Sequence, residues 1–109
     1  MLEKTPLRIE VRRTPSDATL LVLSGDLDYD TAAGLLTLAE GLSRRDVRHL
    51  ELDLSGLNFV DSSGVAALIN VYNAARDHGV AMRIVALTSY LRHMFRVTAL
   101  DQIFDLPPG

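Results

Sequence analysis

Apolar and charged residues alternate at the start of the chain, which is the pattern of a β-strand with one buried face. Between residues 7 and 13 each apolar residue is followed by a charged one, and this period of two predicts a strand. The turn-forming segment 14–17 follows, and residues 18–23 predict a second strand, so the two form a hairpin. Because residues 20–23 are all apolar, we expect both faces of the second strand to be covered.

Three later segments space their apolar residues as helices do. Residues 31–42 predict the first helix, with Asp30 as its N-cap. The second helix is predicted from Val65 onward and is expected to end at Gly79, because glycine is the usual residue just after a helix. A third helix is predicted from an inner stripe of Leu91, Met94 and Phe95.

Short strands are predicted between and after these helices, at residues 50–54, 80–87 and 103–106. Strands that alternate with helices require parallel crossovers, whereas the first hairpin is antiparallel. The pattern therefore predicts an α/β fold with a mixed β-sheet covered by helices. The length of 109 residues fits one domain over residues 1–109, and the Pro-Pro-Gly segment 107–109 is expected to be a disordered tail.

Composition and charge exclude several classes of function. The chain has no cysteine, which excludes disulfides, thiolate metal sites and a thiol nucleophile. Its net charge of −3, with Lys4 as the only lysine, is unfavourable for nucleic-acid binding. The longest apolar run, residues 65–69, is far shorter than the roughly 20 residues that span a bilayer. The first residues lack the basic-then-apolar order of a secretory signal, so we expect a cytoplasmic protein.

Asp26, Asp28 and Asp30 have the spacing of the first ligands of a calcium-binding loop. The positions that should supply a glycine and a bidentate glutamate hold Thr31 and Thr37 instead. An acidic loop that ends in a helix cap accounts for the same residues. We therefore predict no metal site.

The segment 57–64 contains the richest candidate chemistry, since it joins a strand to the start of a helix with Asp61, Ser62, Ser63 and Gly64. Asp61 or Ser62 can cap the helix. A serine nucleophile is a second interpretation, although the small residue expected before the serine of a nucleophile elbow is absent. A third interpretation is a phosphorylation site, because the free N–H groups of a helix N-terminus can hold a phosphate.

Two segments carry a family resemblance. Residues 50–69, LELDLSGLNFVDSSGVAALI, resemble the signature of STAS domains, and most of all the Asp-Ser-Ser-Gly phosphorylation motif of bacterial anti-sigma factor antagonists. Residues 23–32, LSGDLDYDTA, are similar to the family's Gly-x-Leu-Asp-x-x-Thr-Ala segment. One departure is Ala66, where the antagonists often have a second glycine.

The resemblance implies a binding switch and not an enzyme. Ser62 would be phosphorylated by an anti-sigma factor that is also a serine kinase. The unphosphorylated form would bind this kinase and release its sigma factor, and a metal-dependent serine phosphatase would reset the switch. ATP and magnesium would belong to the kinase, so we expect no cofactor. The implied partner-binding residues are Asp28, Asp61, Ser62, Ser63 and Gly64.

Two other functions remain open from the sequence. A STAS domain can also be a regulatory subunit of a stress-signalling scaffold or of a transporter. A small serine hydrolase that uses Ser62 or Ser63 is the alternative from a different class.

Overall fold

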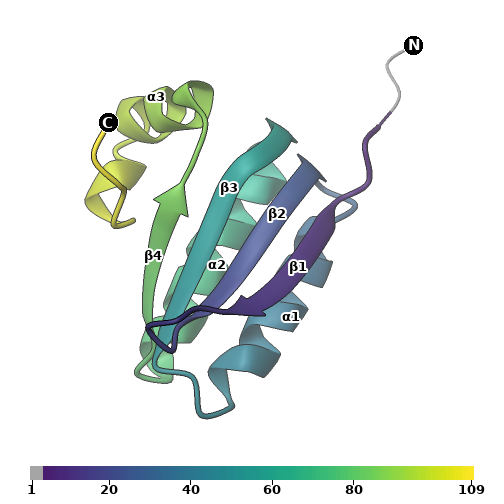
Figure 1. Ribbon diagram of the computed structural model, residues 1–109. Coiled ribbons are helices and arrows are strands. Elements are labelled where there is room, and N and C mark those ends of the chain that lie inside the picture. Colours follow the sequence, from purple (N-terminus) through teal and green to yellow (C-terminus); the bar gives the residue numbers. More distant parts are fainter. Residues whose placement is uncertain (1–3) are drawn as a thin grey trace.

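The computed structural model describes residues 4–109 and shows a four-stranded sheet with helices packed on one of its faces (Figure 1). The strand order is β1-β2-β3-β4; β1 is antiparallel to β2, whereas β3 is parallel to both β2 and β4. This confirms the predicted mixed sheet with its N-terminal hairpin. The strands are β1 (Arg8–Arg13), β2 (Thr19–Leu27), β3 (His49–Val60) and β4 (Ala81–Ala86), and the helices are α1 (Ala32–Ser43), α2 (Ser62–Asp77), α3 (Ser89–Val97) and the short 3₁₀-helix η1 (Leu100–Gln102).

The core lies between the sheet and the two helices α1 and α2, which cover the same face (Figure 1). Both crossovers, β2 to β3 and β3 to β4, move in the same direction across the sheet, and right-handed crossovers of this kind place their helices on one side. The side chains that point inward are completely buried, and they include Leu21 and Leu23 of β2 and Leu50, Leu52 and Leu54 of β3.

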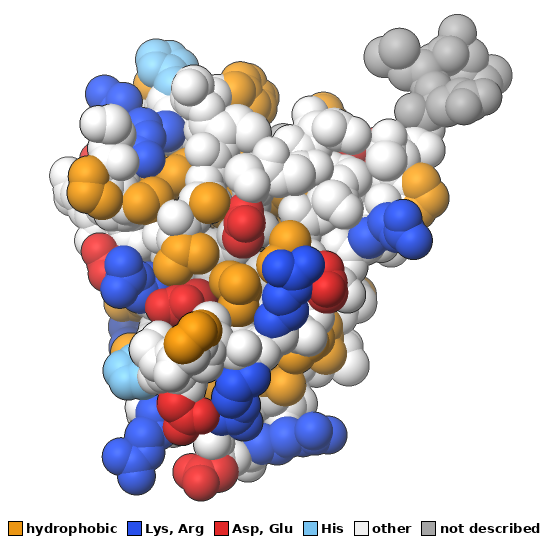
Figure 2. All heavy atoms as spheres, viewed as in Figure 1, with side chains coloured by type: hydrophobic (Ala, Val, Ile, Leu, Met, Phe, Trp, Pro, Cys, Tyr) orange, Lys and Arg blue, Asp and Glu red, His pale blue; other side chains and the backbone are white. Residues whose placement is uncertain are grey.

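The opposite face of the sheet is open, so the prediction that both faces of the second strand are covered is wrong. Leu20 and Val22 of β2 are only half-buried there. Figure 2 shows this open face, on which apolar side chains are interspersed with charged ones. A run of four apolar residues therefore indicates a central strand here and not a strand covered on both faces.

Both central strands extend beyond the predicted ranges. The segment from Ser24 onward has the polar composition of a loop, yet β2 continues through it to Leu27 and pairs with Val60. Register shifts between β2 and β3 accommodate the segment. Gly25 adopts a φ of 91°, and a Cβ at this position would lie 2.1 Å from the carbonyl oxygen of Pro6. Ser24 and Gly25 therefore belong to an irregular, bulged part of β2, although their composition is typical of a turn.

The predicted strand at residues 103–106 is wrong. The chain forms η1 and then buries Phe104, whose ring lies 5.4 Å from that of Phe95 and 6.2 Å from that of Tyr72 in edge-to-face geometry. One hydrogen bond, from Ile84 N–H to the Asp105 carbonyl at 3.0 Å, joins this segment to β4. The ladder cannot continue because Pro107 and Pro108, which follow Leu106, have no N–H.

The second helix begins at Ser62, three residues earlier than predicted, and is followed by Gly79 at a φ of 71°. This left-handed conformation confirms the predicted role of Gly79 at the helix end. Among the described residues, no helix has both the length and the apolar composition needed to cross a membrane.

Candidate functional site

The candidate site lies where β2 and β3 end and where α1 and α2 begin, and Asp61 joins these elements. The Asp61 N–H donates to the carbonyl of Leu27 at 3.2 Å. Its carboxylate accepts from the Gly64 N–H at 2.9 Å and from the Tyr29 N–H at 3.2 Å. The bond from the Gly64 N–H shows that Asp61 is the N-cap of α2. The bond from the Tyr29 N–H joins this cap to the loop that follows β2.

Ser62 and Ser63 form the first turn of α2. Ser62 is exposed, whereas Ser63 is half-buried and lines an apolar cleft of about 550 Å³ between α1 and α2. Within residues 4–109, the N–H groups of these two serines have no hydrogen-bond acceptor. Free N–H groups and the positive end of the helix dipole make this turn suited to an anion.

Gly64 is buried against the end of β2. A Cβ at this position would lie 2.4 Å from the carbonyl oxygen of Leu27 and 2.9 Å from Cγ1 of Val60. The absence of a side chain lets α2 approach the strand closely. Gly64 thus positions the turn, and its predicted contact with a partner stays a prediction.

Asp28 is 5% exposed and organises the loop before α1 from within. Its Oδ1 accepts from the N–H groups of Asp30 at 3.0 Å and Thr31 at 3.2 Å, and its Oδ2 lies 3.4 Å from Nζ of Lys4. The predicted helix cap at Asp30 is therefore wrong. Asp28 binds the free N–H groups of the loop, whereas Asp30 is exposed and forms an ion pair with Lys4.

The environment of Asp28 keeps its carboxylate ionised. Burial alone would raise the pKa of Asp28, but the charge of Lys4 and the hydrogen bonds of the loop outweigh burial and hold this pKa below its usual value. The pKa of Lys4 is raised, chiefly by its hydrogen bond to Asp30. The predicted role of Asp28 in partner binding stays a prediction, and its buried position indicates that it would act through the shape of the loop.

Sequence reasoning missed three residues that build this loop. Tyr29 is 80% exposed beside the cap of α2, and the Thr31 hydroxyl donates to the Asp26 carbonyl at 3.0 Å. Lys4 was noted only as the sole lysine. The Thr-Ala end of the upstream motif was a signal for Thr31, but the contact between Lys4 and Asp28 spans 24 positions and no local pattern indicates it.

The acidic residues of the loop are engaged with protein groups. Asp26 accepts from the Thr5 N–H at 3.0 Å. In the part of the chain that the structure describes, no group of three His, Asp or Glu side chains could hold a metal ion. Within that part, no histidine is hydrogen-bonded to Ser62 or Ser63, and Nδ1 of His78 lies 2.9 Å from the carbonyl of Ala74 instead.

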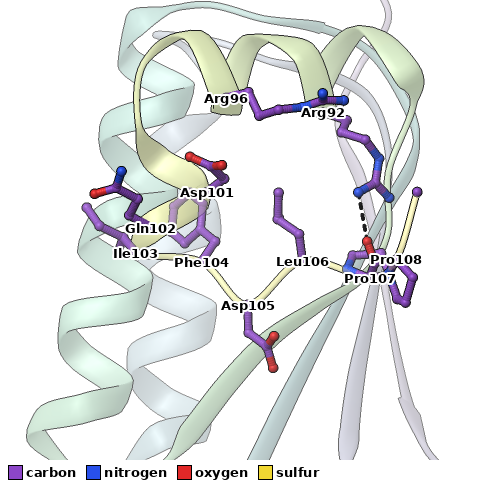
Figure 3. Close-up of a pocket in the computed structure, with 11 residues that line it drawn as sticks. Arg92, Arg96, Asp101, Gln102, Ile103, Phe104, Asp105, Leu106, Pro107 and Pro108 are labelled. Atoms are coloured by element: carbon purple, nitrogen blue, oxygen red, sulfur yellow. Dashed lines mark hydrogen bonds between the residues drawn. The ribbon is translucent and has the colours of Figure 1, made fainter.

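A cavity of about 800 Å³ lies elsewhere, between α3 and the C-terminal segment (Figure 3). Nη1 of Arg92 donates to the Pro107 carbonyl at 2.7 Å and closes one side. Leu106 points into the cavity and Asp105 points away from it (Figure 3). None of the candidate site residues lines this cavity. The predicted disorder of residues 107–109 stays a prediction.

Comparison with known proteins identifies the relatives of the chain. A family model described as "Mlab, STAS domain" matches residues 10–108. An anti-sigma F factor antagonist of Paenibacillus polymyxa is 27% identical over 85 residues, which cover 77% of this chain and 73% of that protein.

Solved structures share the fold. An anti-sigma factor antagonist from Mycobacterium paratuberculosis matches with a TM-score of 0.82 at 24% identity, over 95% of this chain and 87% of that one. The unphosphorylated form of the anti-sigma factor antagonist SpoIIAA matches with a TM-score of 0.75 at 14% identity, over 94% and 90% of the two chains. The phosphorylated form, from Bacillus, matches with a TM-score of 0.71 at 14% identity, over 94% and 93%.

Proposed function

The chain belongs to the STAS domain family, and on this basis we propose that it is an anti-sigma factor antagonist whose binding is controlled by phosphorylation of Ser62. The observation that carries the proposal is the exposed Ser62 at the first turn of α2, beside two N–H groups that have no acceptor within residues 4–109. A hydroxyl in this position is accessible to a kinase, and the adjacent N–H groups can hold the resulting phosphate. The name of the Paenibacillus relative supports the same function.

In the unphosphorylated state, the turn formed by Asp61, Ser62 and Ser63 is the proposed contact for an anti-sigma factor that is also a serine kinase. Binding to this turn releases the sigma factor. A phosphate on Ser62 adds a charge of about −1.5 to −2 beside Asp61. The added charge weakens the complex because it must be desolvated and because it repels acidic groups of the partner.

The chain is a substrate in this proposal, and the kinase supplies ATP and magnesium. Ser62 needs no base of its own, because the kinase provides one. A metal-dependent serine phosphatase removes the phosphate and restores binding. Asp28 and Gly64 contribute indirectly in this proposal. Asp28 holds the loop before α1, and Gly64 lets the start of α2 pack against β2, so together they position Asp61 and Ser62.

Phosphorylation is tested by incubating the chain with a candidate anti-sigma kinase, ATP and magnesium, and by mapping the phosphate with mass spectrometry. We expect one phosphate on Ser62. Ser62→Ala should abolish the modification, whereas the matched variant Ser63→Ala should keep it. A phosphate on a different residue, or none with a kinase that binds the chain, contradicts the proposal.

The affinity of Ser62 variants for the same kinase shows whether the charge or the size of the side chain at this position controls binding. Ser62→Asp should weaken binding at least tenfold, whereas Ser62→Asn, which has nearly the same shape without the charge, should stay within about threefold of the wild type. If Ser62→Asn weakens binding as much as Ser62→Asp does, the effect is steric and the electrostatic mechanism is wrong.

A further inference from the structure

Within residues 4–109, strand β1 is an edge of the sheet, because β2 is its only neighbour in the strand order (Figure 1). Thr14 N–H donates to the Ala18 carbonyl at 2.9 Å, in line with the β1–β2 register. Hydrogen-bonded and non-bonded pairs alternate along an antiparallel ladder. The even-numbered residues of β1 therefore bond to β2, and the backbone groups of Ile9, Val11 and Arg13 point away from the sheet.

The side chains of this edge carry opposite charges and form an ion pair. Glu10 and Arg12 share the open face of the sheet, since they pair with Val22 and Leu20. The Arg12 guanidinium donates to both oxygens of Glu10, at 2.9 Å and 2.8 Å. Between them, Val11 points to the other face and is 47% exposed.

Charge determines which pairing of β1 with a second β1 is favourable. If a two-fold axis passes through Val11, Glu10 of each copy lies directly opposite Arg12 of the other. A shift that brings the axis to Glu10 or to Arg12 places like charges opposite each other. Opposite charges across a strand pair contribute about 0.2–1 kcal/mol each, and like charges are destabilising. Opposite charges also meet when the axis passes through Ile9, because Glu10 then lies opposite Arg8 of the other copy. Charge therefore allows two registers, one centred on Val11 and one centred on Ile9.

A cleft of mixed character lies next to this edge, where charged side chains such as Arg12, Arg45 and Asp46 line it beside three apolar ones. Val11 lines this cleft of about 350 Å³ together with Leu42 of α1 and Val47 of the following loop. In the register centred on Val11, the two Val11 side chains face each other beside the two clefts. Charges on an exposed edge usually oppose association, whereas Glu10 and Arg12 attract each other in this register. Of the two registers that charge allows, only this one places the two Val11 clefts against each other.

We propose that β1 pairs antiparallel with β1 of a second copy of this chain, in the register centred on Val11, to form a continuous eight-stranded sheet. Ser62 lies at the end of β3, away from this edge, so the dimer leaves the candidate site accessible. A seam of five residues from each strand, 9–13, is small, so the dissociation constant should be about 0.1–1 mM.

The dimer is tested by sedimentation equilibrium, which measures the dissociation constant of the wild type and of variants with exchanged charges at protein concentrations from about 10 μM to 1 mM. Glu10→Arg and Arg12→Glu should each weaken association at least tenfold, because each places like charges opposite each other. The double variant E10R/R12E restores opposite charges and should return to within about threefold of the wild type. Val11→Pro removes an outward N–H and should also prevent association, whereas Val11→Thr keeps this N–H and should not.

Circular dichroism of each variant verifies that the monomer remains folded. A wild-type chain that is monomeric up to 1 mM overturns the proposal. A dimer that is unaffected by the single exchanges or by Val11→Pro also overturns it, because its interface would lie elsewhere. Failure of the double variant to recover would show that the two charges do not face each other across the seam. None of these results bears on the phosphorylation of Ser62.

Discussion

Replacing Gly64 by alanine would place a methyl group against the backbone of β2. The new Cβ would lie 2.4 Å from the Leu27 carbonyl oxygen, whereas a favourable contact needs about 3.5 Å, so α2 or β2 must move by about 1 Å. Overpacking of this kind costs about 1–3 kcal/mol, and the helix propensity of alanine returns at most about 1 kcal/mol. We expect Gly64→Ala to lower the free energy of unfolding by about 1–2 kcal/mol.

Gly34 of α1 offers the matched control, because a Cβ there meets nothing within 4 Å. Gly34→Ala should therefore raise the free energy of unfolding by about 0.4–1 kcal/mol. Urea denaturation measures both variants, and thermal melting should shift by roughly 4–8 °C per kcal/mol. If Gly64→Ala is as stable as the wild type while Gly34→Ala is stabilised, the close approach of α2 to β2 does not require glycine and the reasoning fails.

Two further predictions concern the acidic residues of the site. Asp61→Ala removes the cap of α2 and should lower the free energy of unfolding by about 1 kcal/mol in the same urea assay, and an unchanged midpoint would show that the cap is dispensable. The lowered pKa of Asp28 means that its stabilising effect is present above the ordinary pKa of 3.8 and is lost as the pH falls through the folded-state pKa. Between about pH 5 and pH 2 the wild type should lose more stability than Asp28→Asn does, and parallel pH profiles would contradict the role of the ionised carboxylate.

Features that depend on neighbouring residues could be predicted from the sequence. The hairpin, a helix cap at Asp61 or Ser62 and the helix end at Gly79 each follow from a few consecutive side chains, and the structure shows that Asp61 is the cap. The order of strands and helices then restricts the fold to a mixed sheet. Local patterns were sufficient because each of these features is stabilised by contacts between residues that are close in the sequence.

Features that depend on distant contacts could not be predicted. Ser24 and Gly25 have the composition of a loop, and only pairing with β3 and the approach of Pro6 keep them in a strand. Asp28 looks like a surface carboxylate in sequence, yet Lys4 and the loop amides hold it inside. The segment after α3 has the pattern of a strand, but burying Phe104 between two aromatic rings outweighs strand pairing.

The two anchors of Asp61 determine what kind of switch this turn can be. Its N–H is bonded to the carbonyl of Leu27 and its carboxylate to the N–H of Tyr29, so the start of α2 is fastened to the rigid sheet on one side and to the loop on the other. In the proposed switch, a phosphate on Ser62 adds charge to a turn that these two bonds already hold. The switch would then act through charge and not through a change in the path of the backbone, and its rate would be set by the kinase and the phosphatase.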